Sequence, residues 1–153
     1  MSRVIRPARS TDAGKLGAIL SEAVRANTWK PQLHTAAEDI AHMGHLIDRG
    51  WVSVCESEGR VAGFLALDGT SVQSLYVSDA QQGHGIGAML LEQAKAQQER
   101  LELWVFEANH GAQRFYRRHG FKDVERTDGA GNEEGLPDMR YAWVKSEKEP
   151  QDG

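Results

Sequence analysis

The sequence predicts one domain of mixed α/β class, in which a meander of antiparallel strands leads into a parallel β-α-β crossover. The chain has 153 residues, which fits one domain, and its 40% hydrophobic content is enough for one core. Residues 51–79 hold three β-rich runs, separated by Glu58-Gly59 and Asp68-Gly69. Both dipeptides suit tight hairpin turns, because glycine adopts positive φ without a steric penalty. A strand, a helix and a strand then follow over residues 71–106, an order that predicts a right-handed parallel crossover.

The N-terminal part is expected to form a short strand and two helices. The strand, at residues 4–5, is stopped by Pro7. Apolar residues at helical spacing predict a first helix over residues 13–27, with capping oxygens from Ser10, Thr11 and Asp12. After a loop, Thr35 and Glu38 match the capping box that begins a second helix, and Gly50 lies where its C-cap is expected.

The C-terminal part continues the alternation of helices and strands. We expect a helix over residues 86–98, a strand at 101–106 that is buried on both faces, and a helix over 109–119 closed by Gly120. A final strand pair, at 121–126 and 139–145, encloses the polar loop TDGAGNEEGLPD. The domain is therefore predicted to span residues 1–145, with a disordered tail at 146–153.

Composition narrows the classes of function. A net charge of −4 argues against nucleic acid as a partner, since nucleic-acid binders usually carry a clustered basic face. Cys55 is the single cysteine, so one chain can form neither a disulfide nor a cysteine-based zinc site. His42 and His45 lack a suitably spaced third ligand, and we expect no metal. The absence of a long apolar segment predicts a cytoplasmic protein that does not bind membranes, and a homodimer is left open.

The stretch QQGHGIGAML has three interpretations. Glycines before a helix can simply form a turn, or they can leave backbone amides open to an anion at the positive end of the helix. Residues 83–88 also satisfy the dinucleotide pattern G-x-G-x-x-[G/A], with Glu107 about 20 residues further on. That pattern belongs at the first strand–helix turn of a parallel unit. Here an antiparallel meander precedes it, which counts against a dinucleotide fold.

Two motifs together point to a family. Gln82-x-x-Gly85-x-Gly87 resembles the [Q/R]-x-x-G-x-[G/A] motif of the GNAT superfamily of acyl-CoA-dependent N-acyltransferases. Residues 109–121 are similar to its second signature, N-x-x-A-x-x-F-Y-x-x-x-G-F. The resemblance covers residues 4–145. It implies a GNAT-like fold, with helices on both faces of a sheet whose two central strands splay apart, and acetyl-CoA as co-substrate.

The resemblance also implies the residues that hold the coenzyme. The strand SLYVSD would pair with the pantetheine arm, and a backbone N–H near Tyr76 or Val77 would stabilise the charge that develops on the acyl oxygen. Tyr116 would protonate the departing thiolate as a general acid, although packing alone could explain its ring. Asn109 would cap its helix and contact the pantetheine region. The full expected set of coenzyme-binding residues is Leu75, Tyr76, Val77, Gln82, Gly83, His84, Gly85, Ile86, Gly87, Ala88, Asn109, Ala112, Phe115 and Tyr116.

The sequence gives less information on the general base that deprotonates the amine and on the residues that bind the acceptor amine. Many family members carry a glutamate near the position of Gln73, and glutamine cannot replace it as a base. Glu107 is our candidate; His34, His42 and His45 are alternatives, as is a reaction without a dedicated base. Trp29, Gln73 and Glu134 are the candidate acceptor residues. We expect direct transfer of an acetyl group to a primary amine of a small molecule or peptide in a ternary complex. The alternative is a module that binds acyl-CoA with little turnover.

Overall fold

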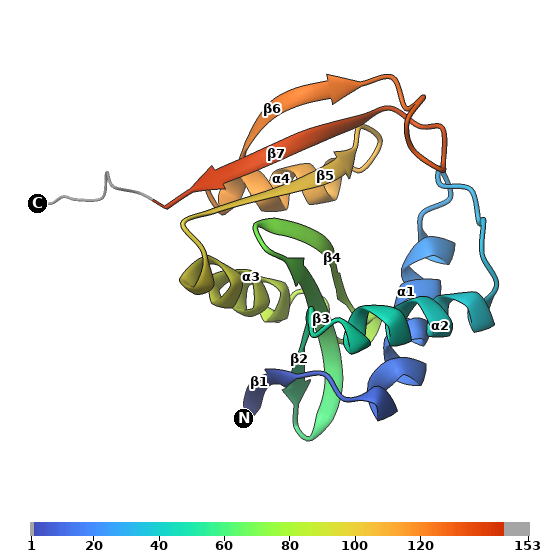
Figure 1. The fold of residues 1–153 in the computed structure, drawn as a ribbon, viewed down its shortest axis with the longest axis vertical. Coiled ribbons are helices and arrows are strands. Elements are labelled where there is room, and N and C mark those ends of the chain that lie inside the picture. The colour runs from blue at the N-terminus through green and yellow to red at the C-terminus, as the bar shows by residue number, and fades with distance from the viewer. Residues whose placement is uncertain (1, 146–153) are drawn as a thin grey trace, which may run out of the picture. The chain divides into compact units, whose positions relative to one another are not determined.

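The computed structural model describes residues 2–145, so the tail expected at 146–153 lies outside the described residues. Figure 1 shows the helices and strands in chain order. They are β1 (Arg3–Pro7), a 3-10 turn η1 (Ser10–Asp12), α1 (Ala13–Ala26), α2 (Ala36–Asp48), β2 (Val52–Ser57), β3 (Arg60–Asp68), β4 (Ser71–Val77), a second 3-10 turn η2 (Asp79–Gln81), α3 (Ile86–Gln97), β5 (Arg100–Phe106), α4 (His110–Arg118), β6 (Lys122–Thr127) and β7 (Asp138–Val144).

The strands are hydrogen-bonded in the order β1-β2-β3-β4-β5-β7-β6. Strand β2 pairs antiparallel with β1 and with β3, and β7 pairs antiparallel with β5 and with β6. Strands β4 and β5 are parallel, with Ser71 opposite Glu102. The mixed sheet with one parallel connection confirms the predicted fold class.

The chain divides into two compact units. Within the described residues, the first consists of residues 2–68 and Val72–Glu92, and the second of Gly69–Ser71 and residues 93–145. The first unit therefore holds strands β1 to β3, most of β4 and the first part of α3. The second holds β5, α4 and the final strand pair.

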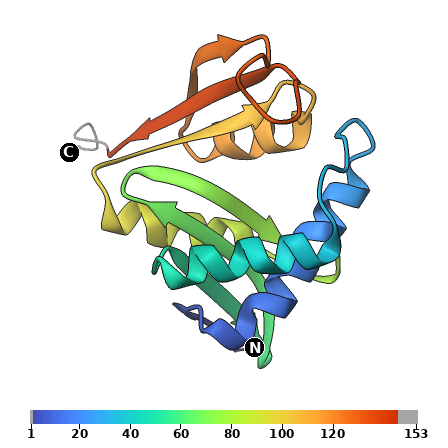
Figure 2. The same ribbon diagram turned by 45° about the vertical axis from the view of Figure 1, so that its right-hand side comes forward.

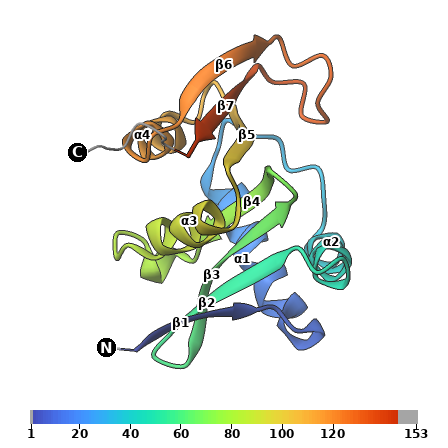
Figure 3. The same cartoon turned by 60° about the vertical axis from the view of Figure 1, so that its left-hand side comes forward.

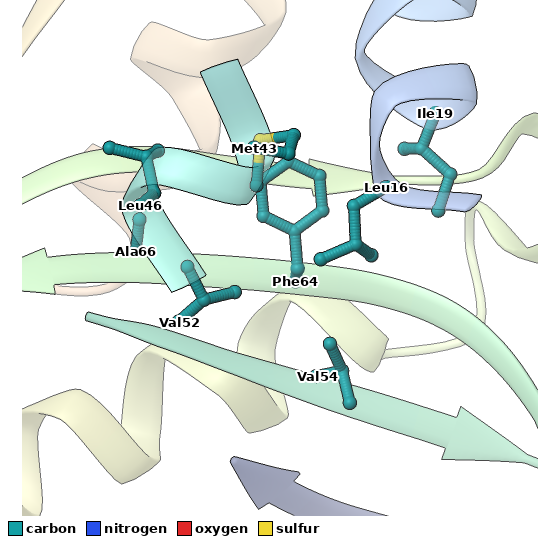
Figure 4. Close-up of a cluster of buried hydrophobic side chains, with 8 residues drawn as sticks. All are labelled: Leu16, Ile19, Met43, Leu46, Val52, Val54, Phe64 and Ala66. Carbon is teal, nitrogen blue, oxygen red and sulfur yellow. The ribbon is translucent and has the colours of Figure 1, made fainter. Parts of the chain in front are cut away.

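The core of the first unit lies between its strands and helices α1 and α2. Figure 4 shows the side chains that meet there, which are Leu16, Ile19, Met43, Leu46, Val52, Val54, Phe64 and Ala66. A β-carbon on Gly17 would lie 2.7 Å from Cα of Ile40, so the two helices touch at the backbone. Next to this contact the buried Ser21 hydroxyl donates to the carboxylate of Asp39 at 2.5 Å. Packing and one buried hydrogen bond together fix α1 against α2.

Helix α3 covers the other face of these strands. In β3, Phe64 and Ala66 point into the core formed with α1 and α2. Side chains alternate along a strand, so Gly63 faces the opposite side. There a β-carbon on Gly63 would lie 3.2 Å from Cγ2 of Ile86, in the first turn of α3. Figure 3 shows α3 on one side of β2 and β3, with α2 on the other.

The start of α1 differs from the expected capping. Asp12 stands at the N-cap position but makes no capping bond with its side chain. Its carboxylate instead accepts hydrogen bonds from the guanidinium of Arg6, at 2.9 and 3.1 Å, and from the N–H of Arg9, at 2.7 Å. Arg6 also donates to Glu56 at 2.6 Å. The hydrogen bonds from Arg6 hold the pKa of Asp12 below its ordinary value, and the two carboxylates raise the pKa of Arg6.

Other local predictions are confirmed by the geometry of the backbone. Thr35 and Glu38 form the capping box of α2, with side chain to N–H distances of 3.1 and 2.8 Å. Gly50 has a φ of 76° just after that helix. In the β2–β3 turn both Glu58 and Gly59 have positive φ, at 54° and 79°, which matches the twist of a tight hairpin.

The second unit packs α4 along one face of β5, β7 and β6, as Figure 2 shows. The ring of Tyr116 meets Phe121 edge-on, with centroids 5.4 Å apart. The ammonium of Lys95 donates to the carbonyl of His119 at 2.6 Å and lies 5.1 Å from the ring centre of Trp143. A cation at the C-terminal end of α4 is favoured by the helix dipole.

The expectation that residues 101–106 are buried on both faces is wrong. Leu101, Leu103 and Val105 are buried, whereas Trp104 between them is 49% exposed. The strand therefore alternates between an apolar and an open face, as in an antiparallel sheet that is covered on one side. The prediction rested on the apolar run LELWVF. An apolar residue type such as tryptophan does not show whether its side chain faces the core or the solvent.

Candidate functional site

The glycine stretch lies between β4 and α3 in the first unit. Gly83 and Gly85 have φ values of 82° and 83°, a region that side chains disfavour. A β-carbon on Gly83 would meet nothing within 4 Å. Glycine is therefore needed at position 83 because of its positive φ. A side chain there would have enough room.

Gln82 fastens this loop to the end of β4. Its side-chain amide donates to the carbonyl of Val77 at 3.2 Å and to Oδ1 of Asp79 at 3.3 Å. Residues 82–85 are all exposed, including the imidazole of His84. The loop is thus held at its base while its backbone faces solvent.

The loop ends at the N-terminus of α3. The first helical hydrogen bond runs from the N–H of Met89 to the carbonyl of Gly85, at 3.0 Å. The N–H groups of Ile86, Gly87 and Ala88 come before it, and no carbonyl within the helix can accept from them. Ile86 is 1% exposed and anchors this turn in the core. Three amides at the positive end of a helix, next to two positive-φ glycines, have the geometry that suits an anion such as a phosphate.

The last residues of β4 lie directly before this loop. Leu75, Tyr76 and Val77 are half-buried, and the ring of Tyr76 packs against Phe64 with centroids 5.8 Å apart. Sequence reasoning missed Gly63, on the neighbouring strand β3. A β-carbon there would stand 2.8 Å from the carbonyl oxygen of Tyr76, so glycine is needed for the close approach of two backbones. An isolated glycine inside a strand pattern is the signal that could have revealed it.

The second unit carries the other signature on α4. The side chain of Asn109 accepts from the N–H of Ala112 at 3.1 Å, which confirms its predicted role as the helix cap. Gln113, which the sequence analysis did not single out, is buried and donates to the carbonyls of Phe106 and Glu107 at 3.3 and 2.8 Å. These bonds fix the start of α4 to the end of β5.

Tyr116 lies on the inner side of α4. It is 9% exposed, and its ring meets Phe115 and Phe121 edge-on, at centroid distances of 5.1 and 5.4 Å. The packing expected as its alternative role is therefore present. A ring held on two sides also fixes the direction of its hydroxyl, so packing and acid catalysis do not exclude each other.

The candidate base, Glu107, lies at the surface of the second unit. Its carboxylate is 45% exposed and pairs with the guanidinium of Arg126 at 2.9 Å. Its N–H donates to the carbonyl of Pro137, which places it beside the loop between β6 and β7. The alternatives His34, His42 and His45 are exposed residues, in the α1–α2 loop and on α2. Glu107 as a base stays a prediction.

The candidate acceptor residues lie on three separate elements. Trp29 is half-buried in the α1–α2 loop, Gln73 is exposed on β4, and Glu134 is half-buried in the β6–β7 loop. That last loop is well organised. Asp138 accepts from the hydroxyl of Thr127 and from the side chain of Asn132, which also donates to the carbonyl of Leu136 at 2.8 Å.

Within residues 2–145, no three His, Cys, Asp or Glu side chains are grouped so that they could hold a metal ion. No helix in the same range is both long and apolar enough to cross a membrane.

The fold and the two signatures together define a coenzyme-dependent acyltransferase. The family model described as "Acetyltransferase (GNAT) domain" matches residues 48–123. The peptidyl-lysine N-acetyltransferase YjaB of Salmonella typhimurium is 32% identical over 130 residues, which cover 81% of this chain and 86% of that protein. YjaB of Escherichia coli is 29% identical over 92% of this chain and 96% of its own length. The chain belongs to the GNAT family of acetyltransferases, and its predicted class, an N-acetyltransferase dependent on acetyl-CoA, is confirmed.

Solved structures agree with this assignment. The solution structure of apo YjaB from Escherichia coli superimposes with a TM-score of 0.79 at 25% identity, over 95% of this chain and all of that one (100%). The structure of yncA from Salmonella typhimurium, solved with its cofactor acetyl-CoA, has a TM-score of 0.73 at 22% identity and covers 100% of this chain and 99% of its own. The second likeness concerns the fold alone.

Proposed function

We propose that this protein transfers the acetyl group of acetyl-CoA directly to a primary amine, within a ternary complex, and that the amine is a lysine side chain of a peptide. The observation that carries the proposal is the backbone of the β4–α3 loop. Two positive-φ glycines and the unpaired amides of Ile86, Gly87 and Ala88 are suited to the diphosphate of the coenzyme. The choice of a peptide lysine rests on the two YjaB relatives, which are named peptidyl-lysine N-acetyltransferases.

The reaction needs few groups from the chain. The amine nitrogen attacks the thioester carbon, the C–S bond breaks, and an amide forms. A backbone N–H at Tyr76 or Val77 would donate to the acyl oxygen as negative charge develops there. Orientation of the two reactants alone lowers the barrier by several kcal/mol.

The reaction also needs two proton transfers, one to the departing thiolate and one from the amine. The thiolate takes a proton from the hydroxyl of Tyr116, since a phenol with a pKa of about 10 is still protonated at neutral pH. The amine gives up a proton to Glu107 or to water. The pairing of Glu107 with Arg126 means that its carboxylate would have to turn from that partner to act as a base.

An assay of thiol release tests the proposal. Acetyl-CoA is incubated with the protein and a lysine-containing peptide, and free thiol and acetylated lysine are measured together. We expect both products in equal amounts, and no acetylation of the same peptide with its lysine replaced by arginine. Saturable binding of acetyl-CoA without thiol release for any amine would favour the acyl-CoA-binding module instead. The cytoplasmic location, the homodimer and the lack of nucleic-acid binding stay predictions.

A further inference from the structure

Arg3, the first residue of β1, reaches the glycine loop. It lies on the strand opposite Ser57, yet its Nη1 is 3.8 Å from Sδ of Met89, which is 86 residues further along the chain. The same Nη1 lies 3.7 Å from the position that a β-carbon on Gly85 would occupy. Its guanidinium therefore stands beside the residue that precedes the first turn of α3.

The guanidinium of Arg3 has one buried hydrogen-bond donor that is not used within the described residues. Its Nε is buried and has no hydrogen-bond partner among the residues that the structure describes. Nη1 contacts a thioether sulfur, which is a weak acceptor. A buried donor that lacks an acceptor is costly, so such a group calls for a specific explanation.

Arg6, on the same strand, has a different environment from that of Arg3. Arg6 directs its Nε, Nη1 and Nη2 at the carboxylates of Glu56 and Asp12, at 2.6, 2.9 and 3.1 Å. Its charge is neutralised within the protein. Arg3 instead places its charge beside Gly85, the residue that directly precedes the three amides at the start of α3.

We propose that Arg3 is a further coenzyme-binding residue, whose guanidinium donates to a diphosphate oxygen held at the Gly85 loop. This inference rests on the proposed function. Guanidinium is planar and presents its N–H groups in a fork that fits two phosphate oxygens. The amides of the first turn of α3 supply partial charge, and Arg3 adds a full charge from a neighbouring strand. Arg3 thus acts on the diphosphate and not on the thioester, so its effect is on binding.

Calorimetry with two ligands tests this role. Coenzyme A and dephospho-coenzyme A share the diphosphate, and only the first has a 3′-phosphate. Arg3→Gln should weaken the binding of both by about tenfold, the usual loss for a hydrogen bond to a charged group. The affinity should also fall less steeply with added salt, because one ion pair has been removed. Arg3→Lys should bind with intermediate affinity.

The control is Arg25→Gln, which removes the same charge from an exposed position in the last turn of α1. It should bind both ligands like the wild type. Thermal unfolding of each variant separates lost binding from lost structure. If Arg3→Gln does not fold, the NMR signal of the Arg3 Nε–H in the wild type should still move when coenzyme A is added.

Three results would overturn the role of Arg3. They are an unchanged affinity in folded Arg3→Gln, a loss confined to coenzyme A, which would assign Arg3 to the 3′-phosphate, and an Nε–H signal that does not respond to the ligand. A wild-type protein that binds neither ligand would contradict the proposed function as well. The two failures are therefore distinguishable.

Discussion

A β-carbon on Gly63 would stand 2.8 Å from the carbonyl oxygen of Tyr76. It would also lie 3.3 Å from Cα of Val77, on the same neighbouring strand. Real β-carbon atoms essentially never show contacts under 3.0 Å, so β3 and β4 could not stay at their present separation. Gly63 therefore sets the position of the two residues whose N–H groups are proposed to serve the acyl oxygen.

Gly63→Ala should destabilise the protein and lower its turnover together. We expect a loss of about 1–3 kcal/mol in the free energy of unfolding, because the added methyl group overpacks a backbone contact. Urea denaturation measures the first effect and the thiol-release assay the second. The control is Gly44→Ala in α2, where a β-carbon meets nothing within 4 Å. That change should stabilise the helix slightly, by up to about 1 kcal/mol. Equal stability of the two variants would contradict the assigned contact.

Tyr116→Phe should separate catalysis from binding. The variant keeps the ring that packs on Phe115 and Phe121 and loses only the hydroxyl. If that hydroxyl is the general acid, kcat should fall by about 100-fold or more while the Kd for acetyl-CoA stays nearly unchanged. The rate of product formation at saturating substrate gives kcat, and calorimetry gives the Kd for acetyl-CoA. Wild-type turnover in Tyr116→Phe would remove the acid role and leave packing as the function of this residue.

The Arg6–Asp12 pair should make stability depend on pH. Asp12 has a folded-state pKa below its ordinary value of 3.8, because Arg6 stabilises the charged carboxylate. The contribution of Asp12 to the free energy of unfolding is therefore fully present above its pKa in the unfolded chain. It is lost as the pH falls through its pKa in the folded protein. Asp12→Asn should cost about 1–3 kcal/mol at pH 7, and the difference from the wild type should shrink as the pH falls below 3.8, the ordinary pKa of the carboxyl.

Urea denaturation across this pH range provides the measurement, with Asp48→Asn as the control. Asp48 is exposed at the end of α2. Its replacement should change the unfolding free energy by at most about 0.5 kcal/mol at any pH. A difference between Asp12→Asn and wild type that is constant from pH 7 to low pH would contradict the ion pair as its source.

Local patterns predicted most of the fold. The capping box at Thr35, the positive φ of Gly50 and the cap at Asn109 all depend on residues a few positions apart, and all are confirmed. Asp12 does not cap α1 itself, because its carboxylate is bound to Arg6 and to the N–H of Arg9, where it caps the 3-10 turn η1 instead. The burial expected for residues 101–106 failed because hydrophobicity does not report which way Trp104 points.

The site was predictable in part for the same reason. The glycine loop and α4 are continuous motifs, so the sequence shows them directly. Gly63 lies close to Tyr76, and Arg3 lies close to Gly85. In both pairs the two residues are far apart in the sequence and meet only in the folded protein. One sequence does not show which residues such contacts join, although the isolated glycine inside a strand pattern does mark Gly63 itself.

An NMR titration of the backbone amides with acetyl-CoA tests the central claim most directly. The claim is that the loop before α3 holds the diphosphate of the coenzyme. The signals of Gly83, Gly85, Ile86, Gly87 and Ala88 should shift together and saturate at the same coenzyme concentration, with large downfield changes where an N–H begins to donate to phosphate. Saturating shifts elsewhere in the protein, with these five amides unmoved, would contradict the account.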